Sequence, residues 1–115
     1  MKAFHISPKK NRRKILNEGL KPTLGPRSRR FGESEPKLFL TQNIKDSIDL
    51  INIRFFNSHP DFIEGIDVWE VNIIEPFDIN SDERFPKGFY VKDGTKIENI
   101  KLKKSFKWVD QIKQF

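Results

Sequence analysis

A histidine and a serine near the start of the chain, followed by a cluster of arginines, are the residues whose types and spacing could do chemistry. His5 precedes Ser7 by two positions, and Gly25, Arg27 and Arg29 follow in a Gly- and Pro-containing stretch. An imidazole, with an ordinary pKa of about 6.5, can bind a ribose hydroxyl or a phosphate, or move a proton. Arginine pairs bidentately with phosphate. The group predicts a site for an anionic, phosphorylated ligand.

Each of these residues also has a purely structural interpretation. His5 could satisfy a backbone carbonyl group, and Ser7 could cap a helix that has Pro8 at its first position. The arginines, together with Lys21, could form a solvated loop. The sequence contains neither a P-loop nor a dinucleotide-binding fingerprint, so phosphate binding is predicted from residue types alone.

Hydrophobic periodicity predicts the elements that position His5 and Ser7. Residues 2–7 alternate, with Phe4 and Ile6 on one face, which predicts a short strand that has the histidine on its other face. A helix is expected over residues 8–18. Gly19 should end this helix in a left-handed conformation.

The rest of the chain predicts a second helix and a late sheet. Residues 21–36 form a long loop by composition. Apolar residues at helical spacing predict a helix over 43–57, capped by Thr41 or Asn43. Residues 105–115 fit a helix slightly better than a strand. Strands are expected at 38–41, 65–74, 89–92 and 97–102, with a turn at Asp93-Gly94. This order predicts an α+β fold with a mainly antiparallel sheet.

Charge is distributed unevenly along the chain. Residues 1–30 hold ten Lys or Arg against one acidic residue, residues 31–98 hold seven against fourteen, and residues 99–115 hold five against one. Two explanations are open. The basic ends could meet a phosphate-bearing ligand or nucleic acid, or they could pack near the acidic middle and neutralise it.

Length and composition limit the classes of protein that the chain can represent. It has 115 residues, a net charge of +6 and no cysteine, which predicts one domain without disulfides or thiolate metal sites. No zinc-binding or EF-hand pattern is present, so no metal is expected. No segment has the length and apolar character of a signal peptide or membrane span, so no membrane partner and a cytoplasmic location are expected.

Several short motifs together resemble the opening of ADP-ribosyltransferase-like domains. In that superfamily a strand ends in His-x-Ser/Thr, a helix ends in Ile-Leu-x-x-Gly-Leu, and a later strand resembles Ile-Tyr-Leu-Thr. The matching segments here are His5-Ile-Ser7, Asn11, Ile15-Leu-x-x-Gly-Leu20 and Leu38-Phe-Leu-Thr41, with a looser likeness at Ile97 to Leu102. The usage of Asn, Lys and Ile suggests a microbial or phage source.

The resemblance implies two early helices packed on small, mainly antiparallel sheets that form a cleft for NAD or an ADP-ribose derivative. His5 would contact the ribose on the nicotinamide side, and Ser7 would lie beside it. Phe39 or Thr41 would line the nicotinamide pocket. Arg27 would meet the pyrophosphate. The expected domain spans residues 1–102, followed by a basic and aromatic tail at 103–115.

Catalytic members of the superfamily use a late glutamate, and this chain departs from that pattern. The corresponding strand, residues 87–92, contains no acidic residue, and Glu98 is among the nearest candidates. The catalytic hypothesis is therefore His5 with Glu98. The alternatives are a non-catalytic module that sequesters a nucleotide or binds a protein partner, and a nucleic-acid binder that uses the basic ends.

Overall fold

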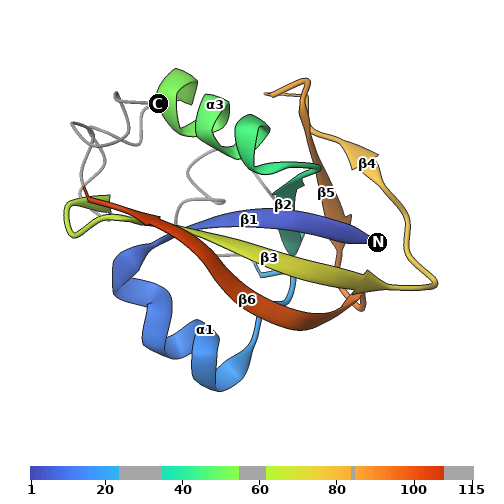
Figure 1. The fold of residues 1–115 in the computed structure, drawn as a ribbon. Helices are drawn as coiled ribbons and strands as arrows, with labels where there is room; N and C mark the ends of the chain where they lie inside the picture. The colour runs from blue at the N-terminus through green and yellow to red at the C-terminus, as the bar shows by residue number, and fades with distance from the viewer. Residues whose placement is uncertain (24–34, 55–61, 84, 108–115) are drawn as a thin grey trace.

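The computed structural model describes residues 1–23, 35–54, 62–83 and 85–107 (Figure 1). Two α-helices and one short 3-10 helix occur with six strands in these residues. In chain order the elements are β1 (Lys2–Pro8), η1 (Lys9–Asn11), α1 (Arg12–Glu18), β2 (Lys37–Thr41), α3 (Ile44–Arg54), β3 (Ile66–Ile74), β4 (Asn80–Ser81), β5 (Gly88–Lys92) and β6 (Lys96–Phe106).

The six strands form one sheet in the order β4-β5-β2-β1-β3-β6, and every neighbouring pair is antiparallel. The expected α+β class with a mainly antiparallel sheet is therefore confirmed. The N-terminal strand β1 lies inside the sheet, whereas the last described strand, β6, forms one of its edges.

A narrow junction between β1 and β2 divides the sheet into two halves. β1 pairs with β3 over seven register pairs, and β2 pairs with β5 over five. By contrast, β1 and β2 share one register pair, Phe4 with Thr41. The halves β6-β3-β1 and β2-β5-β4 are thus each well paired, and they separate from one another beyond Phe4.

The short connection between β5 and β6 requires the sheet to curl. Only residues 93–95 separate these strands, so the Cα atoms of Lys92 and Lys96 lie within about 15 Å of each other. In a flat sheet, the four strand steps between β5 and β6 would span about 19 Å. Val91 of β5 and Ile97 of β6 accordingly pack in the same hydrophobic cluster. The curled sheet encloses that cluster.

The two helices cover opposite faces of the sheet (Figure 1). One cluster, on the α1 face, contains Ile15 of α1 with Ala3, Leu38, Leu40, Trp69, Val71, Ile73, Phe89 and Val91 of the strands. The other cluster, on the α3 face, contains Ile48 and Ile51 of α3 with Phe4, Phe62, Ile66, Val68 and Phe106. Since the chain uses both faces of β1 and β3, alternate residues of these strands enter different cores.

The start of the first helix differs from the prediction. Pro8 lies in β1, where it pairs with Ile66 and has an extended ψ of 141°. A proline φ near −65° suits an extended strand as well as a helix, and pairing with β3 decides between them here. Helix α1 begins only at Arg12, without a side-chain cap. Gly19 ends it with a positive φ of 79°, at the predicted position, although its ψ of −168° is not that of a left-handed helical residue.

The second helix, α3, and the turn signals follow the prediction within the described residues, and residues 55–57 of the expected helix lie outside them. Asn43 caps α3, because its Oδ1 accepts a hydrogen bond from the Asp46 amide at 2.8 Å. At the Asp93-Gly94 turn, Gly94 has a φ of 89° and the Thr95 amide donates to the Lys92 carbonyl group. The strands on either side of this turn do not pair with each other, however, because β5 pairs with β2 and β4, and β6 pairs with β3.

The C-terminal part of the sheet also extends beyond the prediction. β6 continues to Phe106, which is buried and pairs with Ile66. The helix expected over residues 105–115 is therefore wrong for residues 105–107, and residues 108–115 lie outside the described residues. The strand also passes the expected domain end at residue 102. Packing in the α3-face core explains the extension, because Phe106 fills a position in that core that a shorter strand would leave open.

Candidate functional site

His5 lies at the junction where β1 and β2 separate. It pairs with Trp69 in the β1–β3 register, and its neighbours Phe4 and Ile6 belong to the α3-face core. The half-buried imidazole therefore lies on the α1 face, as the alternation predicted. Its Nδ1 is 2.9 Å from the Phe39 carbonyl oxygen of β2. Because a carbonyl oxygen can only accept, Nδ1 carries the proton and donates, which makes Nε2 the acceptor in the neutral ring.

Ser7 has a different role from the predicted helix cap. Its side chain is 2 % exposed, and its Oγ accepts a hydrogen bond of 2.8 Å from the indole Nε1 of the fully buried Trp69. Buried indole N–H groups need such an acceptor. Ser7 lies on the same face as His5, two residues along β1, so the structure brings both predicted residues together on the α1 face.

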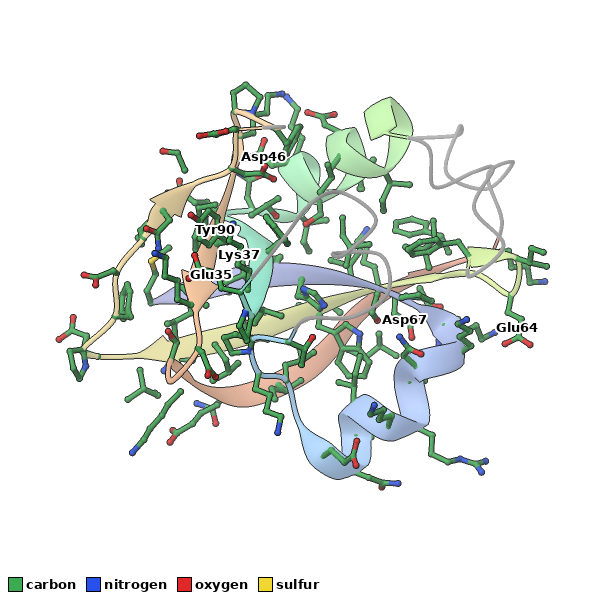
Figure 2. The ribbon with its side chains drawn as sticks, turned by 180° about the vertical axis from the view of Figure 1, so that it is seen from behind. Glu35, Lys37, Asp46, Glu64, Asp67 and Tyr90 are labelled. Carbon is green, nitrogen blue, oxygen red and sulfur yellow. The ribbon has the colours of Figure 1, made fainter. Side chains whose placement is uncertain are left out.

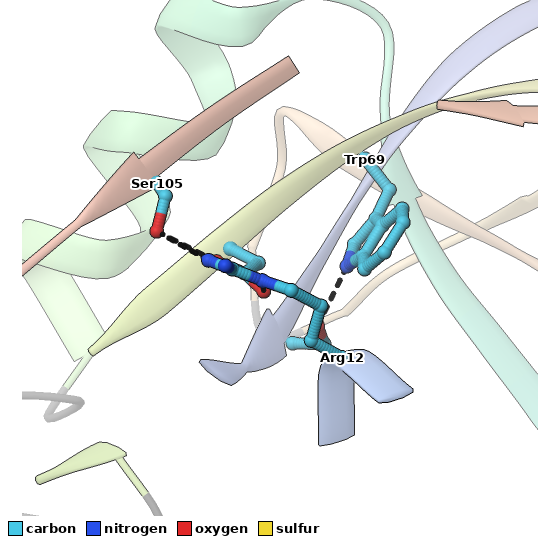
Figure 3. A network of polar contacts seen from close by, with 5 residues as sticks. Arg12, Trp69 and Ser105 are labelled. Atoms are coloured by element: carbon cyan, nitrogen blue, oxygen red, sulfur yellow. Dashed lines mark hydrogen bonds and ion pairs between the residues drawn. The ribbon is translucent and has the colours of Figure 1, made fainter. Parts of the chain in front are cut away.

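Arg12, Asp67 and Ser105 form a polar network next to this pair (Figure 3). Arg12 Nε donates to Asp67 Oδ2 at 2.9 Å, and Nη2 donates to Oδ1 at 2.8 Å. Ser105 Oγ accepts from Arg12 Nη2 and donates to Asp67 Oδ1, each at 2.8 Å. The Asp67 side chain is fully buried, and its hydrogen bond to Arg12 raises the pKa of the guanidinium group.

The sequence did not reveal this network. Asp67 is 55 residues from Arg12 and 38 from Ser105, so no local spacing connects them. The one available signal was that Asp67 shares the apolar alternation face of Trp69 and Val71, a position that usually requires a charged partner. Because the network ties α1 to β3 and β6, it holds the start of the first helix against β3, the strand that carries Trp69.

Phe39 and Thr41 enter the site in different ways from those predicted. Phe39 contributes its carbonyl oxygen to His5, while its ring lies on the α3 face, 5.6 Å from the Tyr90 ring with a tilt of 56°. Lys37 Nζ lies 4.5 Å from the centre of the Tyr90 ring, and Figure 2 shows these two residues grouped away from Asp67. Thr41 is buried, and its hydroxyl bonds the Ser47 hydroxyl at 2.6 Å.

The basic loop is anchored at both ends beside β2. Thr23 and Lys37 form an antiparallel bridge, with two backbone hydrogen bonds of 3.3 Å. Lys21 is exposed just before this bridge. Gly25, Arg27 and Arg29 lie outside the described residues. The chain thus leaves and returns to the sheet at the first residue of β2, two positions before the carbonyl group that receives His5.

Glu98 is not close to His5. In the sheet register, His5 aligns with Trp69 and Leu102, whereas Glu98 aligns with Asn72. Four residues along β6 and two strand spacings across the sheet place their Cα atoms roughly 15 Å apart. Glu98 is also exposed on the edge strand. The structure therefore does not assemble the predicted catalytic pair.

The described residues offer few other sites for chemistry. They contain no group of three or more His, Cys, Asp or Glu residues that could hold a metal ion. Within this part of the chain, no helix combines the length and apolar character needed to cross a bilayer.

The comparisons with known proteins add no relative. No family model, curated protein or solved structure matches the chain. The functional argument therefore depends on the geometry alone.

Proposed function

We propose that the protein is an ADP-ribosyltransferase-like domain that binds NAD, ADP-ribose or a related nucleotide at the junction between β1 and β2. The contact between His5 Nδ1 and the Phe39 carbonyl oxygen, at the point where the two halves of the sheet separate, is the observation that carries this proposal. A nucleotide bound between the two halves of the sheet would lie beside this histidine, the one histidine among the described residues.

The chemistry of the oriented imidazole suits a ribose. With its proton fixed on Nδ1, a neutral His5 ring has Nε2 as an acceptor, and a ribose hydroxyl can donate to it. The contact with β2 also fixes the plane of the ring. A fixed ring reduces the entropy that is lost when a ligand orders a side chain.

The loop between Thr23 and Lys37 is the proposed contact for the pyrophosphate. Its described ends pair next to β2, and its sequence contains Gly25, Arg27 and Arg29. Guanidinium groups complement the oxygens of a pyrophosphate, and Lys21 adds a further positive charge before the bridge.

The position of Glu98 favours binding without ADP-ribosyl transfer. Transfer requires a carboxylate that stabilises the ribose cation as nicotinamide leaves, and that carboxylate must reach the same ribose that His5 contacts. Glu98 is roughly 15 Å from His5 by register. A module that captures a nucleotide, or that presents it to a protein partner, fits this arrangement better than a transferase.

Calorimetric titration with NAD and with ADP-ribose, followed by mass analysis of the recovered ligand, tests the proposal. His5→Asn keeps a donor near the Nδ1 position and removes Nε2, whereas His5→Ala removes both. We expect His5→Asn to keep the thermal stability of the parent and to lose up to about tenfold in affinity, since one hydrogen bond contributes about 0.5–1.5 kcal/mol and 1.4 kcal/mol corresponds to a factor of ten.

Asn80→Ala is the matched control, because it removes another side-chain hydrogen bond to a backbone carbonyl group, that of Tyr90, from the far edge of the sheet. It should bind as the parent does. Unchanged affinity in His5→Asn would show that the histidine is only a structural link to β2. Recovery of free nicotinamide would show turnover and would contradict the non-catalytic version.

A further inference from the structure

Lysines from the two basic ends of the chain meet on one face of the sheet. Lys101 is opposite Glu70 and Lys104 is opposite Val68 in the β3–β6 register. Lys2 and Lys103 both form ion pairs with Glu70. Val68 belongs to the α3-face core, so these lysines lie on that side of β1, β3 and β6. We call Lys2, Lys101, Lys103 and Lys104 the lysine face.

The Glu70 carboxylate lies among these four ammonium groups. Glu70 Oε1 is 3.1 Å from Lys2 Nζ and 3.7 Å from Lys103 Nζ. The hydrogen bond from Lys2, together with the charges of Lys103, Lys2 and Lys101, lowers the pKa of Glu70. Glu98 aligns with Asn72, the residue opposite Lys2, so Glu70 and Glu98 supply two negative charges on this face against the four ammonium groups. The acidic middle of the chain therefore neutralises the basic ends incompletely here.

The lysine face is accessible along an edge of the molecule. The Lys2 and Lys103 side chains are 65 % and 44 % exposed, and Lys101 and Lys104 are also exposed. They belong to β6, the edge strand, and to the start of β1 (Figure 1). Helix α3 lies over β1 and β2 instead. The charges are thus presented in an extended row of about 3.3 Å per residue.

We propose that the lysine face binds the phosphate backbone of nucleic acid. Lysine is a point charge without the fork geometry that selects one carboxylate or phosphate, so a row of lysines suits a linear polyanion that gains affinity by counterion release. Exposed Leu102 aligns with Trp69 and so belongs to the opposite face. Among the described residues of β6, the exposed large apolar side chain thus points away from the lysine face, which is unfavourable for anchoring in a lipid surface. This surface is separate from the junction that holds His5.

A protective role is the alternative explanation of the same lysines. Charged residues on an edge strand prevent pairing with the edges of other molecules. Protection of the edge strand depends on the lysines but not on whether Glu70 is charged. Binding of a polyanion depends on both, because Glu70 repels phosphate and occupies two of the lysines. Glu70→Gln consequently separates the two explanations.

Fluorescence anisotropy with a labelled 20-nucleotide single strand and a 20-base-pair duplex, between 50 and 200 mM salt, tests the proposal. The variant Lys101→Gln/Lys103→Gln/Lys104→Gln should bind the single strand at least tenfold more weakly at low salt. Its slope of log affinity against log salt should decrease by roughly 2, at about 0.7 per lost phosphate contact. Glu70→Gln should bind several-fold more tightly.

Lys45→Gln/Lys87→Gln/Lys92→Gln is the matched control, because it removes the same charge from α3 and the β5 region. It should retain most of the affinity. The proposal is overturned if the parent binds neither probe at 50 mM salt, or if the control loses as much as the lysine-face variant. It is equally overturned if polyglutamate or vesicles of anionic lipid compete as well as nucleic acid at equal charge. NAD titration of the same variants reports on the His5 site independently.

Discussion

At the residue scale, the described polar groups in the α1 face are satisfied by partners that are distant in sequence. Trp69 and Ser7 are 62 residues apart, and the Phe39 carbonyl oxygen is 34 residues from His5. A buried donor or acceptor without a partner costs about 1–3 kcal/mol. Single substitutions at these positions should therefore report on individual hydrogen bonds.

Ser7→Ala should destabilise the protein by about 1–3 kcal/mol, because the buried Trp69 Nε1 loses its acceptor. Urea unfolding followed by tryptophan fluorescence measures the change. Ser81→Ala, at an exposed position of β4, is the control and should change stability by less than about 0.5 kcal/mol. If the two variants were equally stable, the hydrogen bond would not contribute.

Arg12→Ala should cost more, about 3–5 kcal/mol, because it leaves the buried Asp67 carboxylate without its cation. Arg13 is the neighbouring residue and is exposed, so Arg13→Ala removes the same charge and should stay within about 0.5 kcal/mol of the parent. Chemical unfolding of both variants provides the comparison. Similar losses in the two would contradict the structural role of the network.

At the element scale, two glycines with positive φ differ in how closely other backbone approaches them. Gly65 has a φ of 132°, and a Cβ at that position would lie 2.6 Å from the Phe106 carbonyl oxygen. Gly94 has a φ of 89° and would meet nothing within 4 Å. Gly65 also accepts a hydrogen bond from the Lys9 amide. It therefore lies where the start of β3, the end of β6 and η1 come together.

Gly94→Ala should lower the free energy of unfolding by about 1–2 kcal/mol, because a residue with a Cβ is strained in the left-handed conformation. Gly65→Ala carries the same backbone strain and adds a clash with backbone, so it should cost more, about 3 kcal/mol or above. Thermal unfolding of the two variants gives the difference directly. Equal losses would mean that the approach of Phe106 to Gly65 is looser than the structure shows.

The sequence predicted those elements that are decided locally. The alternation of Trp69, Val71 and Ile73 predicted β3, and Asn43 was one of two candidate caps for α3. The start of α1 was missed because Pro8 suits a strand and a helix equally, and its pairing with the distant Ile66 settles the choice. The C-terminal part of β6 was missed for the same reason, since only the α3-face core favours a strand at Phe106.

The candidate site was predictable only in part. His5 and Ser7 share a face because strand alternation is local. Their partners, the Phe39 carbonyl oxygen and the Trp69 indole, depend on strand order, which no short motif encodes. Glu98 was selected by its position in the sequence, and the register of β6 against β3 then placed it away from His5.

At the scale of the whole molecule, ion pairs between distant elements make stability depend on pH. The hydrogen bond from Lys87 lowers the pKa of Asp49, and that from Lys2 lowers the pKa of Glu70. A carboxylate whose pKa is lower in the folded state stabilises it above the unfolded-state pKa, about 3.9 for Asp and 4.3 for Glu. That stabilisation disappears as the pH falls through the lower, folded-state value.

Asp49→Asn/Glu70→Gln should therefore melt at a lower temperature than the parent at pH 7 and at nearly the same temperature once the pH has fallen well below 4. Melting temperatures across this range provide the measurement. The control Glu18→Gln/Glu75→Gln removes two exposed carboxylates and should follow the parent curve. A constant difference at every pH would show that the substitutions act through packing rather than through charge.

The order of the strands has a consequence for the synthesis of the chain. β1 is translated first, yet one of its neighbours is β3, with Lys2 opposite Asn72. β3 in turn requires β6 on its other side. A growing chain on the ribosome therefore exposes the apolar residues on both faces of β1 until β3 and β6 have emerged. The complete sheet forms only after translation has passed Phe106, the last residue of β6. Sheets dominated by such distant pairings then fold over milliseconds to seconds.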